Sequence, residues 1–170
     1  FRLLSISFLG YFKKTLDLEY TPVYTVGAIK LHCEVCQMKH GLSNSVIFAR
    51  GEENTDFAQY FVGRSYLNIL SLQGVVIGNV TFEPGCRNNW HIHQASQSGG
   101  QILLCTGGRG WYQEWGQEPR ELHAGDVVHI PAGVKHWHGA AKNSWFVHLA
   151  VEVPGQDTYN QWLEPVDQSQ

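Results

Sequence analysis

The stretch Gly85–Leu104, GCRNNWHIHQASQSGGQILL, places two histidines one residue apart between glycines and ahead of a hydrophobic run. In an extended strand, residues i and i+2 face the same side, so His91 and His93 reach into one space while Ile92 points away. Two neutral imidazoles that converge form half of a metal site. Two solvated histidines on an open face are the alternative, and the pair alone does not decide between them.

Composition limits the classes of protein to consider. A chain of 170 residues with 43% hydrophobic residues and 18 glycines is long enough for one domain with a core and many turns. A net charge of −3 and a pI near 6.3 give no basic footprint for nucleic acid. No apolar stretch of the sequence approaches the roughly 20 residues of a transmembrane helix. Charged residues make up 16%, below the usual ~25%, which predicts a surface partly buried in a homodimer.

The cysteine content and the first residues bear on the compartment. The segment Leu3–Phe12 has the length of a signal-peptide hydrophobic region, but Lys13 and Lys14 follow it instead of preceding it. Four cysteines are too few for a dense disulfide framework. The sequence therefore predicts a cytoplasmic protein.

Short hydrophobic runs separated by turn residues fill the chain from Ser45 onward. Turn sequences such as Glu83-Pro84-Gly85 and Pro131-Ala132-Gly133 separate runs rich in valine, isoleucine and aromatic residues. This pattern predicts an all-β sandwich or barrel. The expected strands are Ser45–Arg50, Tyr60–Leu70, Val75–Glu83, Asn89–Gln94, Gln101–Thr106, Gly110–Trp115, Asp126–Ile130 and Trp145–Val153.

Three parts of the chain are expected. Residues 1–44 form an irregular N-terminal extension, partly helical over Phe12–Leu18; residues 45–165 form the barrel, and residues 166–170 form a tail. The segment after Pro154 is polar, with Trp162 and Leu163 packing back onto the barrel.

Two motifs resemble those of the cupin family. Gly85, the His91/His93 pair, Gln101 and Gly107 or Gly108 resemble the first cupin motif. Gly125, Pro131-Ala132-Gly133 and His136 resemble the second. The resemblance implies a cupin fold, the double-stranded β-helix or jelly-roll barrel. It also implies one divalent ion (manganese, zinc, iron or nickel), with the ligands His91, His93, Gln101 and His136.

The first motif departs from the family pattern in two ways. Gln101 stands where glutamate is usual, and Gln94–Ser98 are extra residues between the histidine pair and Gln101. Gln94 or Gln97 is therefore an alternative fourth ligand.

Further segments narrow the resemblance. Three segments resemble two groups of cupins, those grouped with the carboxymuconolactone decarboxylases and the manganese-dependent cupin hydroxynitrile lyases. The segments are Gly78–Gly85 (GNVTFEPG), Gly110–Gln113 (GWYQ) and His136–Ala141 (HWHGAA). In the lyase-like cupins, the positions of Gly78, Val80, His148 and Glu152 line the cavity. This implies a substrate pocket at these residues.

The expected ligands are all neutral, so a bound ion keeps its full charge and suits Lewis-acid chemistry. His138, on the same face as His136 if the chain is extended, and His148 are the expected acid–base groups; a rim or second-sphere role for His138 stays open. We expect a lyase, decarboxylase or isomerase that acts on a small hydroxy- or oxo-compound. The alternatives are an oxygen-dependent cupin dioxygenase and a non-catalytic module that binds a small molecule.

A second motif lies outside the expected barrel. Cys33, Cys36 and His40 form a CxxCxxxH sequence that resembles the redox motif of the alkylhydroperoxidase and carboxymuconolactone decarboxylase family. The helical domain that surrounds this motif in that family is absent from the sequence. A zinc half-site or a chance match is therefore the preferred interpretation.

Overall fold

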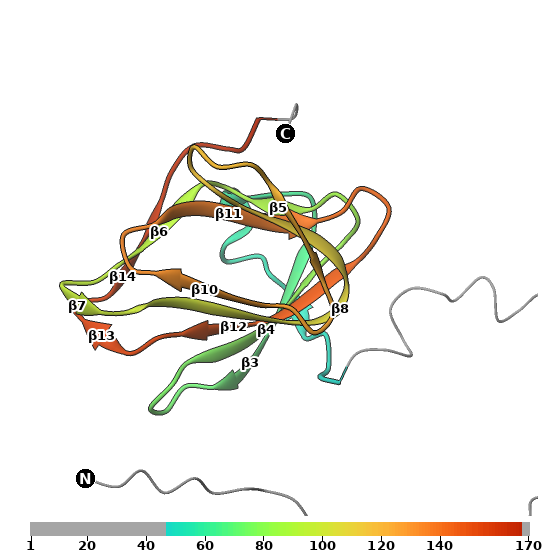
Figure 1. Cartoon of the computed structure of the whole chain (residues 1–170). Helices are drawn as coiled ribbons and strands as arrows, with labels where there is room; N and C mark the ends of the chain where they lie inside the picture. Colours follow the sequence, from blue (N-terminus) through green and yellow to red (C-terminus); the bar gives the residue numbers. More distant parts are fainter. Residues whose placement is uncertain (1–46, 168–170) are drawn as a thin grey trace, which may run out of the picture. The chain divides into compact units, whose positions relative to one another are not determined.

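The computed structural model describes residues 47–167, which form an antiparallel β-barrel of two main sheets and a separate two-stranded sheet (Figure 1). Within this range there is no α-helix, and no helix long and apolar enough to cross a membrane. The elements in chain order are β1 (Glu52–Glu53), the 3-10 turn η1 (Ala58–Tyr60), β2 (Phe61–Val62), β3 (Ser65–Ser71), β4 (Ile77–Phe82), β5 (Arg87–Asn88), β6 (His91–Gln94), β7 (Gln97–Ser98), β8 (Gly100–Glu114), β9 (Arg120–His123), β10 (Val127–Pro131), β11 (Lys135–Ala140), β12 (Phe146–Glu152), β13 (Gly155–Gln156) and β14 (Tyr159–Trp162).

The sequence prediction of an all-β barrel is confirmed. The expected helix at Phe12–Leu18 and the motif of Cys33, Cys36 and His40 lie outside the described residues. The boundaries predicted for the extension, barrel and tail stay predictions.

Strand β8 joins the two sheets. Its first part pairs with β12 and β10, and its last part pairs with β11 and β9. The register with β12 shifts between Val147 and His148, because β8 carries an extra residue there. Gly108 lies at this corner with φ +69°, and a Cβ at this position would overlap the carbonyl oxygen of Trp145. Glycine is therefore required where the chain turns from one sheet to the other.

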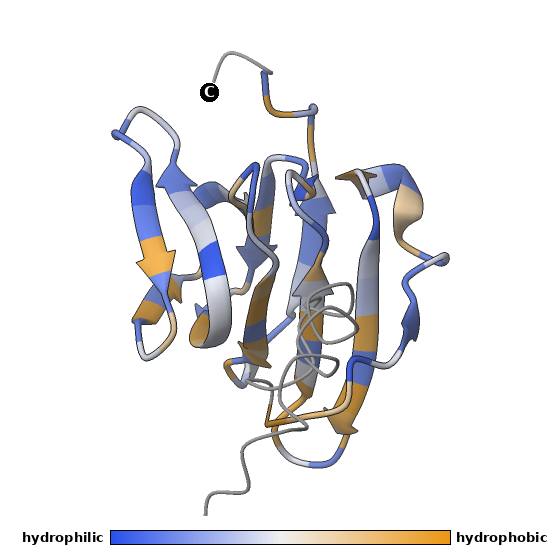
Figure 2. Cartoon of the chain, turned by 90° about the vertical axis from the view of Figure 1, so that its right-hand side faces the viewer, coloured by the Kyte–Doolittle hydropathy of each residue, from blue (hydrophilic) through white to orange (hydrophobic). Residues whose placement is uncertain are grey.

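The interior of the barrel is built from the inward face of each strand. Hydrophilic and hydrophobic residues alternate along the strands (Figure 2), as expected when one face is buried. The fully buried side chains of the main apolar cluster come from strands of both sheets: Phe82, Leu103, Leu122, Ile130 and Phe146. A second cluster joins Trp90 and Trp137 to Val166 near the end of the described chain.

The strand predictions differ from the structure at several places. No strand forms in the described part of Ser45–Arg50, and the two runs expected at Gln101–Thr106 and Gly110–Trp115 are the single strand β8. The sequence prediction missed β9, β11 and β14, each of which mixes charged or polar residues with few apolar ones. The polar segment after Pro154 includes β14, which pairs with β6. The expected packing of Leu163 is confirmed against the second cluster.

The corner glycine gives a test of the fold. Gly116 also has a positive φ, +78°, but a Cβ there would meet nothing within 4 Å. We expect Gly116→Ala to lower the free energy of unfolding by about 1 to 2 kcal/mol, the cost of the left-handed conformation. Gly108→Ala should cost a further ~1 to 3 kcal/mol through overpacking. Urea denaturation of both variants measures this, and equal losses would contradict the assigned role of Gly108.

Candidate metal centre

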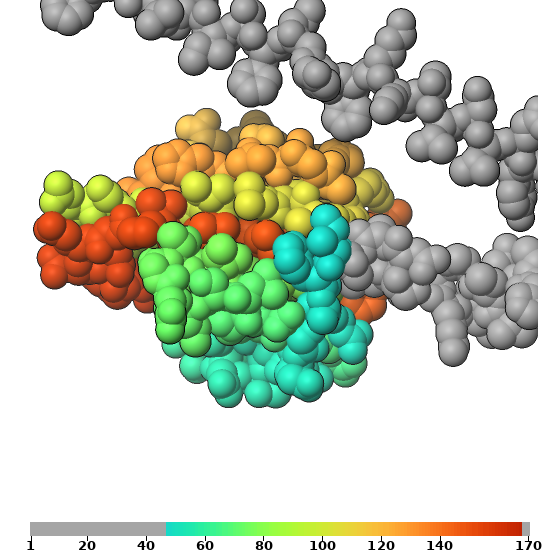
Figure 3. Space-filling view, turned by 90° about the horizontal axis from the view of Figure 1, so that it is seen from below, coloured from blue at the N-terminus to red at the C-terminus, as the bar shows by residue number. Residues whose placement is uncertain are grey.

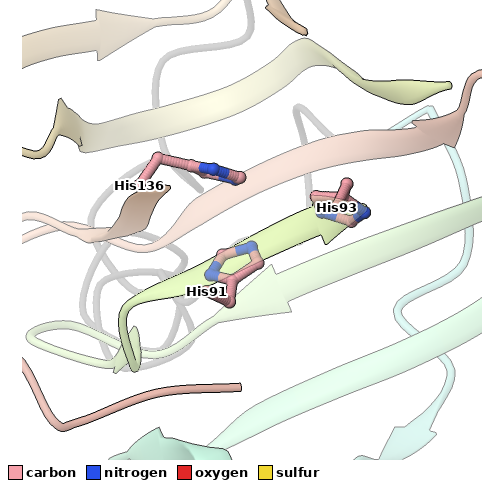
Figure 4. A group of neighbouring side chains, drawn as sticks. All are labelled: His91, His93 and His136. Carbon is pink, nitrogen blue, oxygen red and sulfur yellow. The ribbon is translucent and has the colours of Figure 1, made fainter. Parts of the chain in front are cut away.

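Two neighbouring strands bring three histidines together. His91 and His93 lie on one face of β6, and β11 pairs with β6 so that His136 lies directly opposite His91. One nitrogen from each ring lies within 4.8 Å of the others (Figure 4). All three side chains are buried, with exposed fractions of 2%, 4% and 0%. Alternation along β6 and the register with β11 thus create the cluster.

The proton on each of these rings has a fixed place. Each Nδ1 lies within hydrogen-bond distance of an oxygen that can only accept, so Nδ1 carries the proton and Nε2 carries a lone pair. The acceptors are the carbonyl of Asn89 for His91 (3.0 Å), the carboxylate of Glu152 for His93 (3.0 Å) and the carbonyl of Val134 for His136 (2.9 Å). The Nε2 atoms of His93 and His136 are buried and have no hydrogen-bond partner.

Burial keeps His91 and His136 neutral. Burial lowers the pKa of His136 to about 4, and burial together with the adjacent His136 and His93 holds the pKa of His91 well below its usual value. Neutral imidazole is the form that binds a metal ion, so His91 and His136 are in that form at pH 7.

Gln101 reaches the cluster through Glu152. In the pairing of β8 with β12, Gln101 lies opposite Glu152, and its Nε2 donates to Glu152 Oε1 over 2.9 Å. Its Oε1 is buried and has no partner. Burial alone would raise the pKa of Glu152, but the hydrogen bonds from His93 and Gln101 lower it overall, so the carboxylate is ionised.

The alternative fourth ligands lie elsewhere. Gln94 follows His93 and therefore points to the other face of β6, where its Nε2 donates to Gln161. Gln97 is exposed on β7, which pairs with β13. Of the three glutamines, Gln101 is the one with a buried, unpaired oxygen beside the histidines.

His138 and His148 extend the row of histidines into the barrel. The ring of His138 lies 5.6 Å from that of His91 and 4.8 Å from that of His148, centroid to centroid. Asn88 fixes the ring of His138: its Oδ1 accepts from the main-chain N–H of His138 (3.0 Å), and its Nδ2 lies 3.0 Å from Nε2. Nε2 of His138 therefore accepts, and the proton is on Nδ1, which has no partner.

His148 is the most isolated of these groups. It is fully buried on β12 between the rings of Phe82 and Phe146, and neither of its nitrogens has a hydrogen-bond partner. Burial lowers its pKa to about 3. Burial and the neighbouring His148 likewise hold the pKa of His138 well below its usual value. Unpaired buried nitrogens are costly, and such groups are typical of sites that bind a ligand.

A cavity of about 360 Å³ adjoins the cluster. Its lining consists of Val76, His93, Gln94, Gly100, Glu152, Val153, Thr158, Tyr159 and Asn160. Among the residues predicted for a substrate pocket, Glu152 is part of this lining. Val80 lies opposite His148 and Gly78 opposite Ala150, so both share the inward face of the sheet, outside the cavity lining.

A second cavity of about 380 Å³ lies on the other side of β11. Trp137 lines it together with Trp111 and Pro119. Trp137 alternates with His136 and His138 along the strand and faces the opposite way. This cavity therefore contains none of the histidines.

The sequence prediction missed two residues of the site. Trp162 on β14 stacks on His91 with a centroid distance of 4.8 Å, and Asn88 fixes the proton of His138. Trp162 was expected to pack back onto the barrel, but its contact with His91 depends on the pairing of β14 with β6. Nothing in the sequence distinguishes Asn88 from Asn89.

The residues fit a metal ion. Two buried imidazole nitrogens and one buried amide oxygen have no partner, and these are lone-pair atoms that a divalent ion satisfies. A mixed nitrogen and oxygen set is compatible with manganese, zinc, iron or nickel. Fold and site together define a small barrel with a polar interior able to hold a metal ion.

Comparison with known proteins places this barrel in a family. Residues 78–151 match the model of the cupin domain. The chain is 44% identical over 92 residues to an (R)-mandelonitrile lyase of Granulicella tundricola, an overlap of 54% of this chain and 67% of that protein. The chain belongs to the cupin family and is similar to the cupin hydroxynitrile lyases.

Solved structures agree with this assignment. A cupin-like protein from Thermotoga maritima is 38% identical and superposes with a TM-score of 0.64, covering 72% of this chain and 92% of that chain. The DMSP lyase of Ruegeria pomeroyi superposes with a TM-score of 0.50 at 21% identity, over 67% of this chain and 57% of that chain. The second likeness concerns the fold alone.

The buried His148 predicts a pH dependence of stability. Its pKa is about 6.5 when unfolded and about 3 when folded, so its contribution is complete above pH 6.5 and is lost as pH falls toward 3. For the metal-free protein, we expect His148 alone to lower the free energy of unfolding by about 1.4 kcal/mol for each pH unit below 6.5.

Urea denaturation at pH 7 and pH 5 tests this expectation. His148→Leu should lose less stability between the two pH values than the parent chain, while His129→Leu, at an exposed position of β10, should not change the loss. Equal losses for the parent chain and His148→Leu would contradict the expectation.

Proposed function

We propose that this cupin binds one divalent metal ion and cleaves a small cyanohydrin into a carbonyl compound and hydrogen cyanide. The ligands of the ion are His91, His93, His136 and Gln101. The observation that carries the proposal is that Nε2 of His93, Nε2 of His136 and Oε1 of Gln101 are buried without a partner. His91 completes the group of three histidines, and a cavity lined by His93 and Glu152 adjoins it. The similarity to a protein named (R)-mandelonitrile lyase supports the cyanohydrin as substrate class.

A divalent ion held by neutral ligands supplies Lewis-acid polarisation of a hydroxyl or carbonyl oxygen. We assign to His148 the acceptance of the hydroxyl proton of the substrate, because both of its ring nitrogens are buried and have no partner. The bond to the nitrile carbon breaks, its electron pair leaves with cyanide, and the proton returns from His148 to give hydrogen cyanide. Nδ1 of His138 carries a proton and has no partner in the protein, so we assign to it a hydrogen bond to the substrate.

The substrate contacts extend the proposal to three further residues. Gly78, Val80 and Glu152 lie on strands β4 and β12, on the same face as His148. Because Gly78 has no side chain, Leu67 packs close to its main chain: a Cβ on residue 78 would lie 3.0 Å from Cδ1 of Leu67. We assign the apolar part of the substrate to this face.

The test combines metal content with turnover. Protein purified without chelator should contain about one divalent ion per chain, and the combined change His91→Ala with His93→Ala should remove it. The metal-loaded protein should release benzaldehyde and cyanide from (R)-mandelonitrile. We expect His148→Leu to keep the metal and to lower kcat at least about 100-fold, as for loss of an acid–base group.

Controls and other outcomes separate the alternatives. His129→Leu is the matched control and should leave kcat unchanged. Turnover that requires oxygen and iron would assign the protein to the dioxygenases. A stoichiometric ion without turnover of cyanohydrins, lactones or catechols would indicate a binding module. Metal content unchanged by the double alanine variant would refute the ligand assignment.

The proposal includes a homodimer in the cytoplasm. The two described cysteines, Cys86 and Cys105, are free and buried, as suits a reducing compartment. The hairpin of β3 and β4, green in Figure 3, exposes a group of large apolar side chains. They are Ile69, Leu70, Leu72, Val75 and Val76. A contiguous apolar group of this kind is typical of a protein–protein interface.

Light scattering after size-exclusion chromatography tests the dimer. We expect a mass twice that of the 19.2 kDa chain. Leu72→Glu should shift the protein toward the monomer, because a charge would be buried in the interface. Val127→Glu, at an exposed position of β10, is the control. A monomeric parent protein would exclude the dimer without affecting the metal site.

A further inference from the structure

The carboxylate of Glu152 contacts two of the proposed ligands at once. Its Oε1 accepts from Nε2 of Gln101 over 2.9 Å, and its Oε2 accepts from Nδ1 of His93 over 3.0 Å. In each of these side chains, the polar atom that does not contact Glu152 is buried and unpaired: Oε1 of Gln101 and Nε2 of His93.

We infer that Glu152 is a positioning residue that selects the oxygen of Gln101 and the Nε2 of His93 as metal ligands. The inference rests on the proposed metal site and adds to it the reason why an amide can serve there. An amide side chain can rotate to present either its oxygen or its NH₂ group, and only the oxygen has a lone pair for a metal. Glu152 fixes this choice by holding the NH₂ group.

A carboxylate is the side chain that can do this for both ligands. It accepts through both oxygens, whereas an amide of the same shape accepts on one side and donates on the other. In Glu152→Gln, one orientation of the new amide places an NH₂ group against Nδ1 of His93. The proton of His93 must then move to Nε2, and the ring can no longer bind the ion through that atom.

The other orientation of the amide in Glu152→Gln disrupts the other ligand. The NH₂ group of the new amide then faces the NH₂ group of Gln101, which has to rotate and present nitrogen to the ion. Either orientation therefore loses one of the two ligands. This result does not depend on the charge of Glu152 and follows from its two acceptor atoms.

The position of Glu152 suits this role. Its main chain is held from both sides, because its N–H donates to the carbonyl of Val76 and the next residue, Val153, donates to Gly100. Its side chain is 36% exposed and lines the cavity, so an isosteric change leaves the apolar core intact. Mutation of residues that orient metal ligands typically lowers affinity about 10- to 100-fold.

A reciprocal rescue follows from this arrangement of donors and acceptors. In the double variant Gln101→Glu with Glu152→Gln, the new amide accepts from His93 Nδ1 and donates to the new carboxylate at position 101. Both ligand atoms then keep their lone pairs directed away from residue 152. Glu152→Gln should therefore weaken metal binding in the native background and not in the Gln101→Glu background, a coupling that a double-mutant cycle measures.

The experiment measures manganese and cobalt dissociation constants by competition with a chelator, and the visible spectrum of the cobalt form. The proteins are the parent chain, Glu152→Gln, Gln101→Glu, the double variant and the control Glu121→Gln, whose carboxylate accepts from Arg109. We expect Glu152→Gln to raise both dissociation constants about 10- to 100-fold and to change the cobalt spectrum. The double variant should regain most of the affinity, and the control should match the parent chain.

Three results would overturn the inference in distinguishable ways. Parent-like affinity and spectrum in Glu152→Gln would show that the carboxylate does not select the ligand atoms. Weak binding in Glu152→Gln without rescue in the double variant would show a general structural role. Absence of metal binding by the parent chain would refute the proposed metal site itself.

Discussion

The pairing of β6 with β11 is the constraint on which the rest of the site depends. It places His136 opposite His91, and the alternation of β6 then adds His93 to the same space. A shift of one residue in this register would turn the strand's histidines to the outer face and bring Ile92 inside. The site therefore requires the barrel. The barrel tolerates the polar interior because main-chain carbonyls and Glu152 accept hydrogen bonds from the Nδ1 atoms of the three histidines.

The polar side chains of the interior fall into two groups. One group can offer lone pairs to an ion: His91, His93, His136 and Gln101. The other group, Asn88 and Glu152, orients these or neighbouring side chains by hydrogen bonds and offers no atom to the ion. Between the aromatic rings of Phe82 and Phe146, His148 has no such support and stays neutral through burial alone. This arrangement explains how side-chain atoms with free lone pairs lie beside one ionised carboxylate.

Much of this could be predicted from short-range patterns. The spacing of His91 and His93, the turns and the two motifs predicted a cupin barrel and the histidines that the structure brings together. The fourth ligand was harder to predict, because the extra residues Gln94–Ser98 shift Gln101 away from the usual spacing. Gln101 is buried whereas Gln97 is exposed and Gln94 faces Gln161, and this difference is visible only in the structure. Strands β9, β11 and β14 were missed because their stability comes from pairing and not from a local hydrophobic run. Glu152 makes hydrogen bonds to Gln101 on β8 and to His93 on β6. The first of these depends on the register of β8 with β12, which no local sequence pattern encodes.

The pairing of β14 with β6 has a consequence for how the protein is made. Strand β6 lies between β11 and β14, so one side of the strand with two of the histidines stays open until Tyr159–Trp162 has been added. Until then, β6 is paired with β11 alone. The site is therefore bordered on both sides only after Tyr159–Trp162 has paired with β6 and Trp162 has stacked on His91.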